Sequence, residues 1–116
     1  MNRTIWAIVD DMFFASKIRA TAEALGVTIV FLRTVDAMIE KLDDQEPDLV
    51  IFDLHNPKLN AVNAARELKA RDNEIPLLGF FSHVEVELQK SALAAGFDRV
   101  IPRSVFSSNL ADILKG

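Results

Sequence analysis

Two kinds of apolar pattern alternate along this chain, and the alternation restricts its possible folds more than any other feature. Apolar residues recur every three or four positions in several stretches, as on one side of a helix, and the stripe Phe14, Ile18, Ala22, Leu25 is the clearest. Between these stretches lie short apolar runs typical of strands buried on both faces, at residues 4–9, 27–32, 49–52, 76–81 and 100–101. Five strands alternating with five helices predict an α/β fold with a parallel sheet and helices on both faces.

The residues between the patterns are suited to begin and end helices. Gly26 follows the first stripe and can end that helix, and Thr34 can cap the next one. The tetrapeptide Ser82-His83-Val84-Glu85 has the form of a capping box, which predicts that the fourth helix opens there and carries Val84 on its apolar side. A last helix is expected around Leu110.

Length, charge and cysteine content exclude several classes of function. The 116 residues fit one domain, residues 1–116, and the absence of cysteine excludes disulfides and thiolate metal sites. The apolar run at residues 24–32 is too short to span a membrane, and no export signal is evident, so we expect a cytoplasmic protein without a membrane partner. A net charge of −4 with scattered basic residues argues against nucleic-acid binding. Any effect on transcription would then pass through a protein partner.

Three carboxylates follow two strands that should be neighbours in such a sheet. Asp10 and Asp11 come after the first strand, and Asp53 comes after the third. Since parallel strands end at one edge, we expect the three to meet there and, as like charges, to raise one another's pKa. A cluster of oxygen ligands with open positions suits Mg²⁺. The alternative is that each Asp merely starts a helix or ends a strand.

Four short motifs in one chain resemble the receiver domains of response regulators. They are Val9-Asp10-Asp11, the run Leu49 to Asp53, Asn56-Pro57, and Ala95-Gly96-Phe97-Asp98, and together the resemblance covers the whole length. The resemblance implies a flavodoxin-like, doubly wound (βα)5 sandwich whose five-stranded parallel sheet has the strand order 2-1-3-4-5.

The same resemblance implies roles for individual residues. Asp53 would be the phospho-acceptor, receiving a phosphoryl group from a histidine kinase, a phosphotransfer protein or a small phosphodonor. Asp11 would bind Mg²⁺ directly and Asp10 through water, with Asp53 and the backbone carbonyl of His55 as further ligands. Such a domain is not an enzyme on other substrates; at most it catalyses its own Mg-dependent phosphorylation and dephosphorylation.

The chain departs from the receiver pattern at the residues that usually respond to the phosphoryl group. Phe81 stands where the family has Thr or Ser, and the neighbouring Ser82 either supplies that hydroxyl or serves only as the cap described above. Arg103 replaces the family's Lys and keeps its charge, or is a solvated surface charge. Ser104 replaces the following Pro, so a trans bond is expected there. Val100 replaces a common aromatic residue.

Apolar residues and histidines near the acids suggest further features. Met12 and Phe13 follow the acidic pair and, with Phe80 and Phe81, are expected to form an apolar lip that is a partner surface or a lid over Asp53; core packing is the alternative. The side chains of the two histidines, at positions 55 and 83, are expected at the surface.

Two functions remain open from the sequence. The first is an atypical stand-alone receiver, a monomer or weak homodimer, in which Mg-dependent phosphorylation of Asp53 changes the affinity for a downstream protein partner. The second is a pseudo-receiver, an interaction module that ignores phosphate. A phosphatase fits poorly because His55 stands where a second Asp is needed, and a flavodoxin fits poorly because Asp10 and Asp11 would repel a phosphate.

Overall fold

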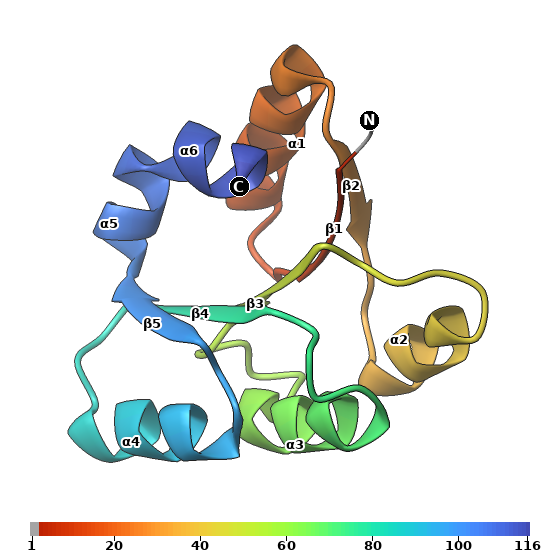
Figure 1. Ribbon diagram of the computed structural model, residues 1–116. Coiled ribbons are helices and arrows are strands. Elements are labelled where there is room, and N and C mark those ends of the chain that lie inside the picture. The colour runs from red at the N-terminus through yellow and green to blue at the C-terminus, as the bar shows by residue number, and fades with distance from the viewer. Residues whose placement is uncertain (1–2) are drawn as a thin grey trace.

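Strands and helices alternate through the computed structural model, which describes residues 3–116 (Figure 1). The strands are β1 (Thr4–Ile8), β2 (Thr28–Phe31), β3 (Leu49–Asp53), β4 (Leu77–Phe81) and β5 (Arg99–Pro102). The helices are α1 (Met12–Leu25), α2 (Val35–Leu42), α3 (Ala61–Arg71), α4 (Val86–Ala95), α5 (Arg103–Ser108) and α6 (Leu110–Lys115).

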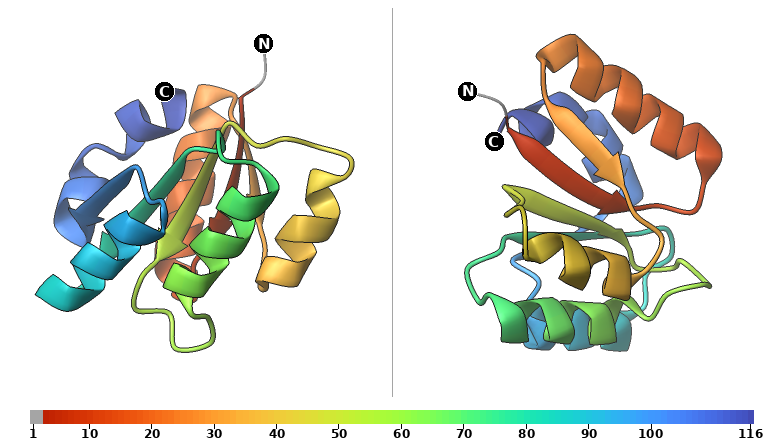
Figure 2. Two further views of the ribbon diagram at one scale, coloured as in Figure 1. Left: turned by 60° about the horizontal axis from the view of Figure 1, so that its bottom comes forward. Right: turned by 90° about the vertical axis from the view of Figure 1, so that its right-hand side faces the viewer.

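All strands pair in parallel in one sheet with the order β2-β1-β3-β4-β5, which confirms the predicted topology. Helices α1, α5 and α6 cover one face of the sheet, and α2, α3 and α4 cover the other (Figures 1 and 2). None of the helices within residues 3–116 is long and apolar enough to cross a membrane.

The central strand β3 is buried along its whole length. Val50 and Phe52 belong to the core between the sheet and α2, α3 and α4, whereas Leu49 and Ile51 belong to the core under α1, α5 and α6. Burial on both faces explains why the strand reads as a continuous apolar run rather than an alternating one. The strand therefore delivers its last residue, Asp53, to the carboxyl edge of the sheet from a rigid support.

The helix boundaries at the start of the chain confirm the sequence predictions. Phe14, Ile18 and Ala22 form the buried side of α1, and Gly26 ends it in the left-handed conformation with φ 71°. Thr34 caps α2, and its hydroxyl accepts a hydrogen bond from a backbone N–H of the first turn at 3.1 Å.

The predicted opening of α4 is wrong. The helix begins at Val86, and Glu85 occupies the N-cap position without a side-chain capping bond. Val84 is 76% exposed and lies outside the helix, so it does not contribute to the core. The carboxylate of Glu85 lies 3.8 Å from the ring of His55 instead of turning back to a capping position. Residues 82–85 therefore match the capping-box pattern in sequence but do not form a capping box in the structure.

The C-terminal helical region is divided in two. Residues 103–108 form α5, which the apolar pattern did not reveal, and α6 carries the predicted buried side with Leu110, Ile113 and Leu114. Asn109 lies between them and its side-chain amide donates to the carbonyl of Val105 at 2.9 Å.

Gly79 in the centre of β4 leaves room for a residue that follows Asp53. A Cβ at this position would lie 2.9 Å from Cδ2 of Leu54 and 3.1 Å from Cε1 of Phe97. Because both are side-chain atoms within the core, we expect Gly79→Ala to lower the free energy of unfolding by about 1–3 kcal/mol. Chemical denaturation measures this loss.

The Leu54→Ala background provides the control for this steric explanation. There the same Gly79→Ala change should cost less, because the Leu54 atoms, which are the nearest ones, are gone and only Phe97 remains. An equal loss in both backgrounds would show that the overlap with Leu54 is not the cause.

Candidate functional site

The sheet brings the three predicted acids to one edge. Ile8 at the end of β1 pairs with Phe52 of β3, so the residues that follow the two strands lie side by side. The right-hand panel of Figure 2 shows the connections from β1 to α1 and from β3 to α3 leaving the sheet on the same side. Asp53 is 8% exposed, whereas the side chains of Asp10 and Asp11 are each 39% exposed. The site thus has one buried acid and two half-exposed ones.

Asp53 sits where its charge is poorly solvated. Burial raises the pKa of the Asp53 carboxyl above its ordinary value, and the negative charge of Asp10 adds to this effect. The backbone N–H of His55 donates to Oδ1 of Asp53 at 2.9 Å, and this bond and the nearby charge of Arg103 lower the pKa in opposition. The prediction that mutual repulsion raises the pKa is right in direction for Asp53, but burial is the main cause.

Asp11 has the opposite electrostatics. Its Oδ1 caps α1 by accepting the backbone N–H groups of Phe13 and Phe14, at 2.9 and 3.1 Å. Its Oδ2 accepts a hydrogen bond from Nη2 of Arg103 at 2.8 Å. The hydrogen bond from Arg103 is the main reason that the pKa of Asp11 is lowered. The expectation that repulsion would raise this pKa is therefore wrong.

Arg103 joins the start of α5 to the start of α1. Besides its bond to Asp11, its guanidinium carbon lies 4.2 Å from the centre of the Phe14 ring, within the range of a cation–π contact. The alternative that Arg103 is a free surface charge is wrong. The peptide bond to Ser104 is trans, as are all others in residues 3–116, which confirms that expectation.

Lys58 supplies a second cation that the sequence analysis missed. Its Nζ lies 3.2 Å from Oδ1 of Asp10, on the loop that follows Asp53. The side chain is 77% exposed, so the pair is worth at most about 1 kcal/mol. A lysine five residues after the predicted acceptor was visible in the sequence, but the path of the loop that carries it to Asp10 was not.

Within residues 3–116, no hydroxyl near the end of β4 contacts the acids of the site. Phe81 is 7% exposed and packs in the core under α2, α3 and α4. Ser82 is exposed, and its side chain makes no hydrogen bond with any residue of the described chain. Val100 packs, half-buried, against the same core as Phe81.

The His55 side chain is less exposed than the sequence analysis expected, because it packs against the loop before α4. It is 18% exposed, and Nε2 lies 3.1 Å from the backbone carbonyl oxygen of His83. The two imidazole rings meet edge to face with their centres 5.3 Å apart. His83 itself is exposed, as expected, although it lies in the loop before α4. Sequence spacing gave no signal for this contact between two loops.

The predicted apolar lip is smaller than expected. Met12 and Phe13 are 81% and 91% exposed, so core packing does not explain them. Phe80 and Phe81 are buried in the cores on opposite faces of the sheet and take no part in a lip. The exposed pair Met12 and Phe13, called the apolar rim below, is what remains at the start of α1.

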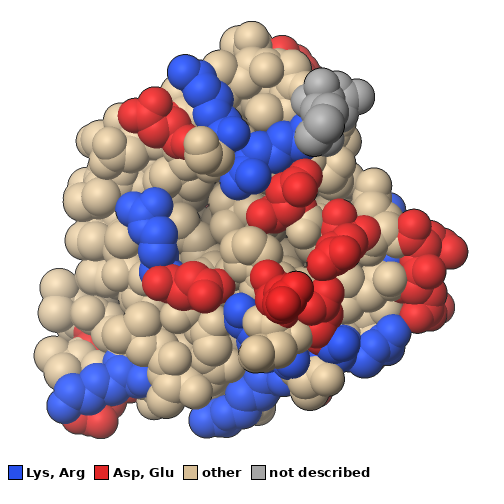
Figure 3. Space-filling model, viewed as in Figure 1, with Lys and Arg blue, Asp and Glu red and all other residues tan. Residues whose placement is uncertain are grey.

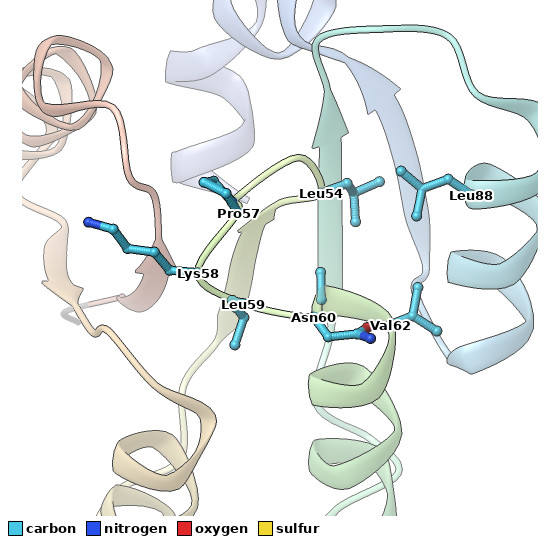
Figure 4. A pocket seen from close by; sticks show the side chains of 8 residues that line it. Leu54, Pro57, Lys58, Leu59, Asn60, Val62 and Leu88 are labelled. Carbon is cyan, nitrogen blue, oxygen red and sulfur yellow. The ribbon is translucent and has the colours of Figure 1, made fainter.

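A groove of about 430 Å³ lies beside the acids but is distinct from them. Figure 4 shows it between the loop after β3, with Pro57 and Leu59, and α4, with Leu88. Lys58 lines this groove and also pairs with Asp10 of the site. The groove thus lies between the loop that follows Asp53, called the acceptor loop below, and α4.

The face drawn in Figure 3 shows no extended basic patch among its described residues. Acidic side chains gather at the centre and on the side of α2, and most of the basic ones lie toward the margin. Among the described residues visible on this face, the basic side chains form no continuous stripe.

Sequence comparison identifies the family. Residues 5–115 match the model of the response regulator receiver domain, so the chain belongs to this family. It is 22% identical over 103 residues to response regulator MprA of Mycobacterium ulcerans (strain Agy99), covering 89% of this chain and 44% of the relative. It is 29% identical over 103 residues to regulatory protein AtoC of Escherichia coli (strain K12), covering 87% of this chain and 22% of that relative. The chain thus spans less than half of either relative.

Solved structures share the fold. A receiver domain protein described as CheY-like from Methanospirillum hungatei JF-1 superposes with a TM-score of 0.85 at 17% identity, covering 99% of this chain and 92% of the other. The receiver domain of sensor histidine kinase PA1611 from Pseudomonas aeruginosa PAO1 superposes with a TM-score of 0.82 at 19% identity, covering 99% of this chain and 96% of the other. That structure is described with a magnesium ion coordinated in the active site cleft. Receiver domains are modules of two-component signalling rather than ordinary enzymes, and the family binds Mg²⁺ at its acidic site.

The opposite electrostatics of two acids give a paired test. When the pKa of an Asp is higher in the folded state than in the unfolded state, the folded protein becomes less stable as pH rises through this range, because the buried group must then ionise. In metal-free buffer, Asp53→Asn should therefore raise the free energy of unfolding at neutral pH, and the gain should vanish in acid. Chemical denaturation at a series of pH values measures the difference.

Asp11→Asn is the matched control, with the reverse sign. Its folded pKa is lowered, so its contribution is present above the ordinary Asp pKa and is lost as pH falls through the folded value. This variant should be less stable than wild type at neutral pH and should converge with it in acid. The same sign for both variants would contradict the charge assignment of the site.

Proposed function

We propose that this chain is an atypical receiver in which Asp53 accepts a phosphoryl group in the presence of Mg²⁺. The observation that carries the proposal is the placement of Asp53: a buried carboxylate at the end of the central strand, beside the acids Asp10 and Asp11 and the charge of Arg103. One of its oxygens is held by the His55 N–H, which orients the carboxylate.

The chemistry requires an ionised carboxylate and positive charge around the transferred group. An oxygen of Asp53 attacks phosphorus, the bond from phosphorus to the donor's nitrogen or oxygen breaks, and the electron pair leaves with the donor. Arg103 provides a planar guanidinium that can bind phosphoryl oxygens, although in this structure it binds Asp11. Bound Mg²⁺ would neutralise the acids and the developing negative charge.

The oxygen atoms of this site are of the kind that Mg²⁺ prefers, although Asp10 and Asp11 are already paired with Lys58 and Arg103. Asp10, Asp11 and Asp53 offer the hard oxygen ligands that Mg²⁺ prefers, and the backbone carbonyl of His55 is a further candidate. As arranged, no three His, Asp or Glu residues of the described chain form a group ready to hold a metal ion. Binding of the ion therefore competes with the cations that now contact Asp10 and Asp11.

The partners proposed for this site are proteins. A histidine kinase or a phosphotransfer protein would supply the phosphoryl group, in the cytoplasm, and the phosphorylated domain would change its affinity for a downstream partner. The apolar rim, Met12 and Phe13, is the candidate contact surface, because large apolar side chains so exposed beside a reactive site are typical of interfaces. Within this proposal the chain acts as a stand-alone monomer or weak homodimer.

A pseudo-receiver is the second candidate, and the burial of Phe81 favours it. A Phe in the core cannot bond a phosphoryl oxygen, and Phe81→Thr would remove packing as well as add a hydroxyl, so that substitution is a poor test. Phosphorylation itself separates the two candidates.

Incubation with Mg²⁺ and acetyl phosphate should add one phosphoryl group to wild-type protein. Intact mass spectrometry measures the gain, and Asp53→Asn should show none because the acceptor oxygen nucleophile is lost. A folded wild-type protein that gains no mass would favour the pseudo-receiver. Equal gain by Asp53→Asn would show that another residue is the acceptor.

Removal of Lys58 should strengthen Mg²⁺ binding. Its ammonium group neutralises Asp10 in the absence of metal, so Lys58→Gln should raise the Mg²⁺ affinity, by at most about fivefold because the pair is exposed. Calorimetric titration or thermal stabilisation by Mg²⁺ measures the change. Lys115→Gln, at the end of α6, makes the same charge change away from Asp10 and should have a smaller effect. Weaker binding by Lys58→Gln would contradict the competition.

A further inference from the structure

The loop of residues 82–85, between β4 and α4, is tied to the site by one side chain. All four of its side chains are exposed, and the first turn of α4 has no side-chain cap. Within the described chain, the side-chain hydrogen bonds and ion pairs of this loop all involve His55. Nε2 of His55 lies 3.1 Å from the carbonyl oxygen of His83 and 3.4 Å from its nitrogen, and Nδ1 lies 3.8 Å from Oε1 of Glu85.

The same residue contacts the proposed phospho-acceptor through its backbone. The N–H of His55 donates to Oδ1 of Asp53 at 2.9 Å. His55 therefore has its backbone on the carboxylate and its ring on the next loop. A phosphoryl group bonded to an Asp53 oxygen changes the acceptor of this N–H, and a shift of the His55 backbone carries the ring with it.

The other links from the acceptor toward α4 run through the sheet backbone: Asp53 pairs with Phe80 of β4, and the N–H of Leu54 donates to the Phe80 carbonyl at 2.9 Å. Among side chains of the described chain, only His55 forms a hydrogen bond or an ion pair with residues 82–85. Phe81 is buried and has no hydroxyl, and Ser82 makes no side-chain hydrogen bond to the acceptor loop. The groove of about 430 Å³ lies between Leu59 on the acceptor loop and Leu88 on α4. The ring of His55 contacts the loop of residues 82–85 directly, edge to face with the His83 ring.

The lengths of the two Nε2 contacts indicate whether the His55 ring donates or accepts the hydrogen bond with His83. A neutral imidazole with its proton on Nε2 donates to the His83 carbonyl, whereas the other tautomer accepts from the His83 N–H. The contact to oxygen, at 3.1 Å, is better than the contact to nitrogen, at 3.4 Å, so donation to the carbonyl is the better geometry.

We infer that His55 is a positioning residue: through its ring and the His83 carbonyl, it couples the occupancy of Asp53 to the position of residues 82–85 and the start of α4. This inference rests on the proposed phosphorylation of Asp53. It assigns to His55 the connection that a hydroxyl at position 81 cannot make in this chain, and it places the output of the site at the amino end of α4.

Backbone amide NMR shifts test the coupling. Mg²⁺ and beryllofluoride, a mimic of the phosphoryl group, are added to the full chain, and shift changes are compared at residues 54–58 and 82–89. Wild type should respond in both segments. His55→Phe keeps an aromatic ring but has no N–H to donate, so residues 54–58 should still respond while the changes at 82–89 are lost. His55→Gln keeps a donor and should restore them.

The control variants separate coupling from packing. His83→Ala retains the backbone carbonyl that accepts the bond, so it should keep the response at 82–89. Retention of that response by His55→Phe together with its loss in His55→Gln would show that ring packing matters and would overturn the proposal. A wild-type response at 54–58 without one at 82–89 overturns it as well. No response at 54–58 in wild type would instead refute the phospho-acceptor role of Asp53, and the coupling with it.

Discussion

Burial of a carboxylate at the end of the central strand is the constraint on which the other features of the site depend. Asp53 cannot be moved to solvent without withdrawing β3, whose residues pack in both cores. A buried charge without partners would cost several kcal/mol, so the surroundings must supply hydrogen bonds and positive charge. The His55 N–H and Arg103 do this in part, and the raised pKa of Asp53 shows that the compensation is incomplete.

The incomplete compensation gives the site its chemical character. Arg103 and Lys58 contact the two half-exposed acids rather than Asp53, so the buried carboxylate of Asp53 keeps an electrostatic penalty in its ionised form. A divalent cation or a transferred group can relieve that penalty, which is why ligand binding and stability are coupled at this edge of the sheet. The ring of Phe14 under Arg103 holds the guanidinium near the site even while it binds Asp11.

The fold and the acids were predictable because both follow from local patterns and one topological rule. Continuous apolar runs and helical stripes predicted the strands and most of the helices, and the parallel order placed Asp10, Asp11 and Asp53 at one edge. The family resemblance singled out Arg103, but its pairing with Asp11 depends on the course of β5 into α5.

The errors came from loops. A capping box was inferred at Ser82, yet α4 begins at Val86 and Glu85 lies beside His55 of another loop instead. Lys58 and the His55 ring were missed for the same reason: each acts on a residue from a different loop, and sequence spacing does not encode those distances. Local sequence patterns thus predicted the strands that carry the acids, whereas the side-chain contacts between loops depend on the tertiary structure.

Titration of the aspartate side-chain carbons by NMR tests the central claim most directly, because it reports the charge of each acid separately. In metal-free buffer the account predicts that Asp53 titrates above the ordinary Asp pKa and Asp11 below it. Saturating Mg²⁺ should lower the pKa of Asp53, since a nearby cation favours the ionised form. An Asp53 carboxyl that titrates like an exposed one and ignores Mg²⁺ would contradict the account.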